Sequence, residues 1–508
     1  LTVTAADDTT ITAASTTDVT ISASALSAAA GNELSVAGGK DVTVTTADSM
    51  DLDDTASNIV VGGATTGASG AVSVTHTETF TDGAGGVGAA DTATGSNITV
   101  TGGTSISVST QATAGDVADN NGDVFTIGAV TITGDANTTS ASITSRAEVA
   151  NGGAAGAIGI TAGTHTIDDK NAASTTAAGT ISAVTLATAG DVTIDSSAIS
   201  TLNLSGTTGT TDIGRGALTA GPSGTSLDIN LTAGTTSTSV GVITDTEAAA
   251  NTFGFRTINV SATPGATAAG AATTNTVADL IAVDATTLNV SGSGSLTFTL
   301  ADVVRNATAV NVTSTGTTDL SGDVLNNAAT FAGGDGVEKI TVGATTKAVS
   351  MGAGDDTVTM DSGVAALGTG GSLDGGEGTG DTIALETADA NSATSTGSFE
   401  SSISGFERLS ITDSAASNSV NLANLDDINY VTTAGSAGTL TISNAASGLQ
   451  VVTTAAATTG TTVGLANSTG LADEVSFTIS GSGNLAAGTF TAPLIETVTL
   501  VADDTGTP

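Results

Sequence analysis

Short segments in which apolar and polar residues alternate recur along the whole chain of 508 residues. Residues 42–44, 106–108 and 192–194 are clear examples, and Gly, Asp or Asn usually bounds such segments, as at strands that end in turns. A helical pattern is confined to residues 277–282 and 300–306, over one or two turns each. The pattern therefore predicts an all-β protein with very little helix.

A hydrophobic–Asn–hydrophobic–Ser/Thr unit repeats in the middle of the chain. Its Asn residues are Asn203, Asn230, Asn259, Asn289 and Asn311, and a further step of similar length reaches Thr341. Since side chains alternate between the two faces of a strand, we expect the apolar pair to face inward and the Asn outward. Steps of about 22–30 residues are typical of one coil of a β-solenoid, in which neighbouring coils bury each other's apolar face.

The five copies are also Asn-x-Ser/Thr sequons, acceptors for N-linked glycan in an organism that makes it. The competing interpretation, that the sequons are a by-product of the strand repeat, is the stronger one. A second unit places an acidic residue shortly before a strand pair, at Glu338, Glu407 and Glu496, with a looser copy at residues 255–260. The apolar residue before this Glu is expected to close the end of a coil.

Between residues 331 and 385 the sequence becomes rich in Gly and Asp. Residues 352–358 fit the nonapeptide G-G-x-G-x-D-x-U-x except for Met351 in place of the first Gly. Residues 333–340 fit it with Glu338 in the Asp position, and the two copies are offset by two nonapeptides. A third copy, residues 375–383, carries one extra residue before Asp381. Gly permits the positive φ of tight turns, and carboxylates are the hard oxygen ligands that Ca²⁺ prefers.

These turns resemble the calcium-binding repeats of RTX proteins, in which each nonapeptide is a half-turn of a parallel β-roll. The resemblance implies that turns two nonapeptides apart stack, that Asp374 follows Asp356 in this way, and that Ca²⁺ lies between turns. Glu338 is a doubtful ligand, because the same Glu recurs at Glu407 and Glu496 without a Gly-rich turn. The implied metal-binding residues are Gly352, Gly354, Asp355, Asp356, Asp374, Gly376, Gly378 and Asp381.

The charge of the chain excludes several function classes. It carries 9 Lys and Arg against 50 Asp and Glu, a formal net charge of −41. Nucleic acids and anionic membrane surfaces need a basic footprint, which nine scattered cations do not make. The absence of Cys excludes a disulfide scaffold. The apolar residues are mostly Ala and Val, which suit thin stacked β-structure, and no run approaches the ~18 apolar residues of a membrane span.

Other candidate residues carry weaker signals. Residues 116–123 gather acidic side chains around a Gly, and Asp48, Asp51, Asp53 and Asp54 form another acidic cluster; solvated turns are the favoured interpretation of both. His76 and His165, the only histidines, each alternate with Thr on an expected strand and are interpreted as ordinary strand residues. No cluster of His or Cys suits zinc, and no nucleophile has a poised base, so we do not expect an enzyme.

The sequence divides into four expected parts. Residues 1–200 are strand-rich and solenoid- or sandwich-like, residues 201–330 form β-solenoid coils of about 22–30 residues, residues 331–385 form the degenerate RTX β-roll, and residues 386–508 form further strand-rich coils. The expected fold is therefore an elongated β-solenoid, or β-helix-like stack of coils, with a short parallel β-roll segment.

The chain, rich in Thr, Ala, Gly and Ser with few aromatics, resembles the calcium-dependent S-layer proteins of Gram-negative bacteria, which are secreted through type I channels. The resemblance is specific at the turns of residues 331–385 and at the strand entry of residues 405–409, and rests on composition elsewhere. The resemblance implies an extracellular structural protein that assembles with copies of itself into a calcium-stabilised lattice on the cell surface. We expect this chain to be part of a longer one. The resemblance also implies attachment to lipopolysaccharide through a segment outside the given chain. The alternative is a calcium-dependent adhesin or surface filament.

Overall fold

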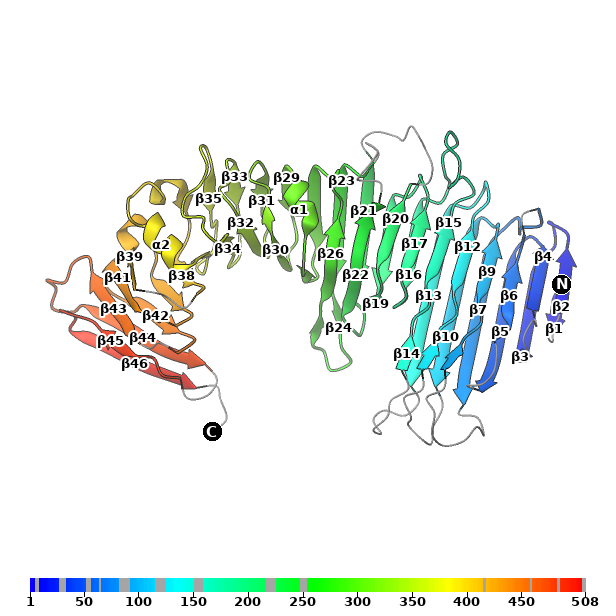
Figure 1. The fold of residues 1–508 in the computed structure, drawn as a ribbon, viewed down its shortest axis with the longest axis horizontal. Helices are drawn as coiled ribbons and strands as arrows, with labels where there is room; N and C mark the ends of the chain where they lie inside the picture. Colours follow the sequence, from blue (N-terminus) through cyan, green and yellow to red (C-terminus); the bar gives the residue numbers. More distant parts are fainter. Residues whose placement is uncertain are drawn as a thin grey trace. The chain divides into compact units, whose positions relative to one another are not determined.

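The computed structural model of the chain is built almost wholly from parallel β-strands and confirms the expected β-solenoid class (Figure 1). The structure describes residues 1–4, 9–26, 33–51, 56–63, 65–81, 92–114, 124–149, 159–215, 225–246, 254–413, 417–435, 437–456, 459–481 and 485–504. The chain divides into two compact units, unit 1 from Leu1 to Ala285 and unit 2 from Thr286 to Pro508.

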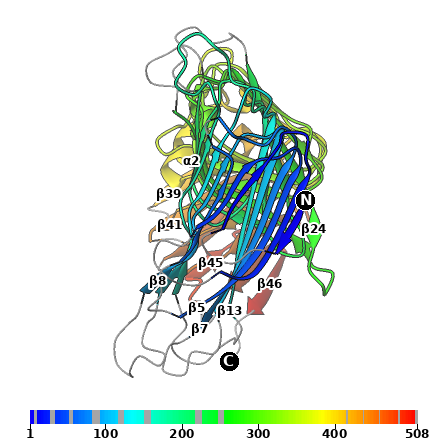
Figure 2. The same ribbon diagram turned by 90° about the vertical axis from the view of Figure 1, so that its right-hand side faces the viewer.

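In unit 1 the chain passes back and forth between two long parallel sheets, and each strand pairs with its counterpart in the next coil. Figure 2 shows β5, β7 and β13 in these coils; β5 pairs with β7, and β10 lies between β7 and β13. The strands of the first sheet are β1 (Thr2–Thr4), β3 (Val19–Leu26), β5 (Val42–Asp51), β7 (Val72–Thr81), β10 (Ser105–Ala114), β13 (Ser140–Val149), β16 (Ala183–Ala187), β18 (Thr201–Ser205), β21 (Ser226–Thr232) and β23 (Thr257–Thr263).

The second sheet of unit 1 faces the first across the core. Its strands are β2 (Thr9–Ala13), β4 (Glu33–Gly38), β6 (Asn58–Val61), β9 (Ile98–Thr101), β12 (Val130–Thr133), β15 (His165–Asp168), β17 (Val192–Asp195), β19 (Thr207–Thr208), β20 (Thr211–Gly214), β22 (Thr238–Asp245) and β26 (Asn275–Ile281). A third short sheet holds β8 (Thr92–Thr94), β11 (Val124–Thr126) and β14 (Gly159–Thr161), and β24 (Gly265–Ala266) pairs antiparallel with β25 (Ala272–Thr273).

Unit 2 repeats the arrangement with shorter strands. One sheet holds β27 (Thr287–Gly292), β29 (Ala309–Val312), β31 (Thr330–Ala332), β33 (Ala348–Ser350), β35 (Ser372–Asp374) and β37 (Ile403–Ser404). The other holds β28 (Leu296–Phe298), β30 (Thr317–Leu325), β32 (Val337–Val342), β34 (Thr357–Met360), β36 (Thr382–Leu385), β38 (Arg408–Ile411), β40 (Tyr430–Thr433), β42 (Leu449–Thr453), β44 (Glu474–Gly481) and β46 (Thr497–Asp504).

Unit 2 also contains a further parallel sheet and several short helical segments. The sheet holds β39 (Asn418–Asn421), β41 (Thr439–Ala445), β43 (Gly460–Leu465) and β45 (Thr489–Thr491). The helices are α1 (Asp302–Asn306), α2 (Thr387–Ala393) and the 3₁₀ segments η2 (Glu400–Ser402) and η3 (Leu422–Asn424). No helix among the described residues has the length and apolar character that crossing a membrane requires.

Alternation of side chains builds the core as the sequence predicts. In β18 the apolar residues Leu202 and Leu204 are buried while Asn203 between them is partly exposed. Since Ala, Val, Ile and Leu supply most of the buried residues, each coil is thin, and the stacking of coils rather than bulky side chains excludes water. The longest coils add one aromatic pair, Phe80 against Phe125, with ring centroids 3.4 Å apart.

The Asn residues of the repeated unit form short ladders on the outer face. The Nδ2 of Asn230 donates to the Oδ1 of Asn203 at 2.9 Å, and Asn311 donates in the same way to Asn289 at 2.9 Å. Asn259 instead lies opposite Asp228 and donates to its Oδ1 at 2.7 Å. The expected step from Asn230 to Asn259 is therefore wrong, because the register of this coil places Asn230 opposite Ser261.

Two other expectations about elements differ from the structure. Residues 277–282 were expected to be helical but lie mostly in strand β26, because alternate residues of this strand face the core. The expected helix at residues 300–306 is confirmed as α1. The predicted step from Asn311 to Thr341 is wrong, since Asn311 lies opposite Ala332 whereas Thr341 belongs to β32 of the opposing sheet.

Candidate metal centre

The Gly-rich turns of residues 331–385 stack at one corner of unit 2. The step of two nonapeptides is confirmed between the first two coils, where Phe331 lies opposite Val349 and Ile340 lies opposite Val358. The next coil is longer, because the connection between β34 and β35 spans residues 361–371 whereas that between β32 and β33 spans residues 343–347, and Val358 lies opposite Ile383. The corner is therefore a roll with unequal coils.

Glycine is required at this corner because successive turns are in backbone contact. Gly352, Gly354 and Gly376 have φ values of +99°, +134° and +100°, which side-chain-bearing residues rarely adopt. A Cβ on Gly354 would lie 1.9 Å from the carbonyl oxygen of Gly336, and one on Gly378 would lie 2.1 Å from that of Gly354. Each turn therefore presents a carbonyl oxygen to the glycine of the next turn.

Glu338, Asp356, Asp381 and Glu407 occupy equivalent positions at this corner in four successive coils, and we call them the carboxylate ladder. The N–H of Glu338 donates to Oδ1 of Asp356 at 2.7 Å, and the N–H of Asp356 donates to Oδ1 of Asp381 at 2.8 Å. The N–H of Asp381 donates to Oε2 of Glu407 at 3.0 Å. Each carboxylate after Glu338 is thus held by the backbone of the preceding coil.

The first three ladder carboxylates each have one oxygen without a hydrogen-bond partner. Glu338, Asp356 and Asp381 are at most 1 % exposed, and Oε1 of Glu338 and Oδ2 of both Asp residues are buried and unpartnered. A buried ionised carboxylate costs free energy unless its oxygens are satisfied by donors or a cation. Protein groups therefore satisfy only one oxygen of each of these three carboxyl groups, and their ionised forms are disfavoured.

The pKa values of three ladder carboxyl groups are raised above their ordinary values. Burial, with a contribution from the neighbouring Asp356 carboxylate, raises the pKa of Glu338 to about 8. Burial likewise raises the pKa of Asp356 and of Asp381 to about 6 each. Hydrogen bonds from backbone N–H groups oppose these shifts without cancelling them. A divalent cation close to these oxygens would relieve both the burial cost and the mutual repulsion.

The remaining predicted ligands lie around the ladder rather than in it. Asp374 ends β35, is exposed, and its Oδ1 accepts a hydrogen bond from the Ser404 hydroxyl at 3.1 Å. It lies opposite Ser350, so Asp374 does not stack on Asp356 as the nonapeptide spacing implied; Asp381 does. The carboxylate of exposed Asp355 packs against Gly380. Asp355 and Asp374 both contribute to the raised pKa of Asp381.

Glu338 and Glu407, which sequence reasoning left out of the ligand set, belong to the same ladder as the two Asp residues. The signal was present in the sequence as an acidic residue shortly before an apolar–polar–apolar strand. Although Glu407 lacks a Gly-rich turn, its carboxylate accepts the N–H of Asp381 from the preceding coil. The acidic residue before a strand is therefore a corner element of the solenoid.

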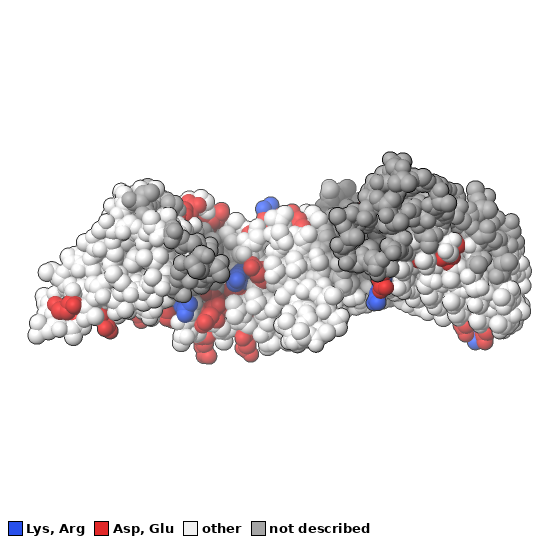
Figure 3. All heavy atoms as spheres, turned by 90° about the horizontal axis from the view of Figure 1, so that it is seen from below, with Lys and Arg blue, Asp and Glu red and all other residues white. Residues whose placement is uncertain are grey.

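The chemistry of the donor set fits calcium. Carboxylate oxygens without partners and backbone carbonyl oxygens at glycine turns are hard ligands, and Ca²⁺ accepts such ligands in irregular geometry. The carboxylates follow one another one per coil, so ions would lie between adjacent turns of the corner. On the face shown in Figure 3, acidic side chains gather in one part of the described surface, with a few basic side chains among them.

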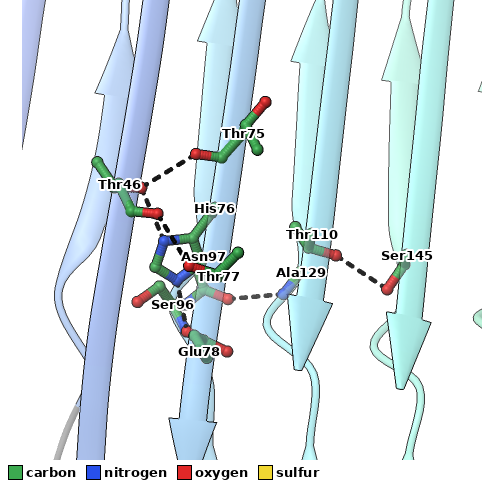
Figure 4. A network of polar contacts seen from close by, with 10 residues as sticks. All are labelled: Thr46, Thr75, His76, Thr77, Glu78, Ser96, Asn97, Thr110, Ala129 and Ser145. Atoms are coloured by element: carbon green, nitrogen blue, oxygen red, sulfur yellow. Dashed lines mark hydrogen bonds and ion pairs between the residues drawn. The ribbon is translucent and has the colours of Figure 1, made fainter. Parts of the chain in front are cut away.

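A second polar cluster lies inside the coils of unit 1 (Figure 4). The Nδ1 of His76 is 2.8 Å from the Thr46 hydroxyl, and its Nε2 is 2.8 Å from Oε1 of Glu78. The order of hydroxyl, imidazole and carboxylate is that of a nucleophilic triad. Thr46 and His76 are each 1 % exposed and Glu78 is 3 % exposed, so a substrate has no access to this hydroxyl. The cluster satisfies buried polar groups within β5 and β7.

His165 and Asp48 are buried in strands of unit 1, whereas most of the two weaker acidic clusters lies outside the described residues. His165 begins β15 and is buried, and burial lowers its pKa to about 4. Asp48 is buried in β5, in register with Glu78. The side chain of Asp51, together with Asp53, Asp54 and residues 116–123, lies outside the described part of the structure.

No protein-family model matches this chain, and no curated protein is significantly similar to it.

Proposed function

We propose that this chain is a structural surface-layer protein of a bacterium, which assembles with copies of itself into a calcium-stabilised two-dimensional lattice outside the cell. The observation that carries the proposal is the row of buried, half-satisfied carboxylates at Glu338, Asp356 and Asp381. A corner of this kind is incomplete as a purely protein structure, and a divalent cation completes it.

The availability of calcium favours a location outside the cell. Extracellular calcium modules bind with dissociation constants of roughly 10⁻⁴ to 10⁻³ M, a range that cytosolic calcium does not reach. The ladder has few carboxylates per coil and a raised pKa at three of them, which suits weak binding of this kind. Inside the cell the site would stay empty and the chain would remain unassembled.

The net charge supports the same conclusion about assembly. A formal charge of −41 opposes contact between copies by mutual repulsion. Divalent cations bound at the corner would lower this repulsion, so that calcium would control both the fold of the corner and the approach of neighbouring copies.

Negative-stain electron microscopy of the purified chain tests the proposal. In roughly millimolar Ca²⁺ we expect ordered sheets, and in EGTA dispersed particles. Isolated rods or filaments in Ca²⁺ would instead favour the calcium-dependent adhesin. Dispersed particles in both conditions, or sheets in both, would contradict a lattice whose assembly depends on calcium.

A further inference from the structure

A second corner of unit 2 repeats the last step of the carboxylate ladder, from Asp381 to Glu407, although its sequence lacks the Gly-rich nonapeptide. It is formed by Asp473, immediately before β44, and Glu496, immediately before β46. The N–H of Asp473 donates to Oε2 of Glu496 at 3.1 Å, just as the N–H of Asp381 donates to Oε2 of Glu407 at 3.0 Å. The backbone also matches, since Thr497 and Arg408 donate to the carbonyl oxygens of Asp473 and Asp381.

The local turn before each Asp is shared as well. A glycine stands three positions before the Asp in both corners, at Gly470 and Gly378. A Cβ on Gly470 would lie 2.8 Å from Oδ1 of Asp473, and a Cβ on Gly378 would lie 2.6 Å from Oδ2 of Asp381. In both corners the Asp carboxylate therefore folds back against its own turn, where only a glycine leaves room for it.

The second corner also has the same unsatisfied oxygen. Asp473 is 9 % exposed, and its Oδ2 is buried without a hydrogen-bond partner, as Oδ2 of Asp381 is. The Glu496 carboxylate comes from the next coil and is exposed to solvent. A buried anionic oxygen beside a second carboxylate that solvent reaches gives an ion both charged ligands and a route of entry.

We propose that Asp473 and Glu496 hold a second divalent cation of the calcium class, at a corner separate from residues 331–385. The inference rests on the calcium part of the proposed function and extends it, because it moves ion binding beyond the glycine-rich repeats. Asp473 and Glu496 supply the charged oxygens, and water completes the coordination on the exposed side.

Ion counting on the full chain tests the second corner. Equilibrium dialysis against ⁴⁵Ca²⁺ gives the number of ions bound per chain for the unmodified protein, for Asp473→Asn and for Glu496→Gln. Both substitutions keep the side-chain shape and remove one charge. We expect each variant to bind one Ca²⁺ ion fewer, or to bind one ion with an affinity at least about tenfold lower, since a charged ligand is lost. Glu474→Gln, an exposed neutralisation at the adjacent position, is the matched control and should leave the count unchanged.

The outcomes separate this inference from the lattice proposal. Counts equal to that of the unmodified chain in both variants would overturn the second site, whether or not sheets form. A lower count in both variants, in a protein that forms no sheets in Ca²⁺, would retain the site and reject the surface-layer role. If Asp473→Asn loses its β-sheet circular dichroism, Glu496→Gln alone decides, because its side chain is exposed.

Discussion

The backbone N–H of Asp356 donates to Oδ1 of Asp381 in the next coil at 2.8 Å, and Oδ2 of the same Asp381 has no hydrogen-bond partner. One oxygen of the carboxylate therefore links two coils, while the other remains a buried charge. Because Glu338 and Asp356 repeat this relationship one coil earlier, the stability of the corner depends on what neutralises the free oxygens.

Calcium should stabilise the corner increasingly as its concentration rises above the dissociation constant. A ligand that binds only the folded state at about 100 times its dissociation constant contributes about 2.7 kcal/mol. We expect Ca²⁺ to raise the melting temperature and to slow exchange of the N–H groups of Glu338, Asp356 and Asp381, measured by hydrogen exchange with mass spectrometry. Peptides from β5 to β13 serve as the internal control. Equal protection with Ca²⁺ and with EGTA would show that the corner is complete without metal.

Neutralising Asp356 should have opposite effects with and without metal. Asp356→Asn keeps an oxygen for the N–H of Glu338 and removes one buried charge. In EGTA its free energy of unfolding should therefore equal that of the unmodified chain or exceed it by roughly 1 kcal/mol. In Ca²⁺ it should be less stable, because a charged ligand is missing. Thermal melts in both buffers measure the crossover, and exposed Asp427→Asn is the control. A shift of the same sign in both buffers would argue for a purely structural Asp356.

Backbone contact at the corner predicts a severe effect of one methyl group. Gly354→Ala combines a φ of +134° with a Cβ 1.9 Å from the Gly336 carbonyl oxygen. We expect it to lower the free energy of unfolding by at least about 2 kcal/mol. Gly363→Ala has φ of +81° but no atom within 4 Å of its Cβ, and should cost about 1 kcal/mol. Urea denaturation measures both. Equal costs would mean that strain, and not contact between the turns, decides.

The alternation of residues such as Leu202, Asn203 and Leu204 predicted the strands and the buried face well, because period-two patterning is local. Register was harder, since it depends on how many residues each turn holds. The sequence placed Asp374 on Asp356 by counting two nonapeptides, but the residues inserted before β35 lengthen that coil, and Asp381 takes the position. A nonapeptide count carries no information about such insertions.

The candidate site was predicted only as far as its glycines and two of its carboxylates. Asp356 and Asp381 follow from the motif, whereas Glu338 and Glu407 act through hydrogen bonds between one coil and the next. Whether an acidic side chain before a strand is buried depends on the neighbouring coil. The same limit explains why Asp473 was not singled out, because its partner Glu496 belongs to a different coil.

The buried His165 predicts a loss of stability in weak acid. Val130 N–H donates to its Nδ1 at 3.1 Å, so protonation there breaks this bond and charges a buried ring. The pKa of His165 is about 4 in the fold and near 6.5 in the unfolded chain, so between these pH values the unfolded chain binds more protons. The free energy of unfolding therefore falls as the pH drops through that window, by on the order of 3 kcal/mol. The ladder carboxyls, with raised pKa values, contribute the opposite slope. Urea melts of the unmodified chain and His165→Asn at pH 7 and pH 5 separate the two: the variant should lose less stability on acidification, and equal losses would contradict the role of His165.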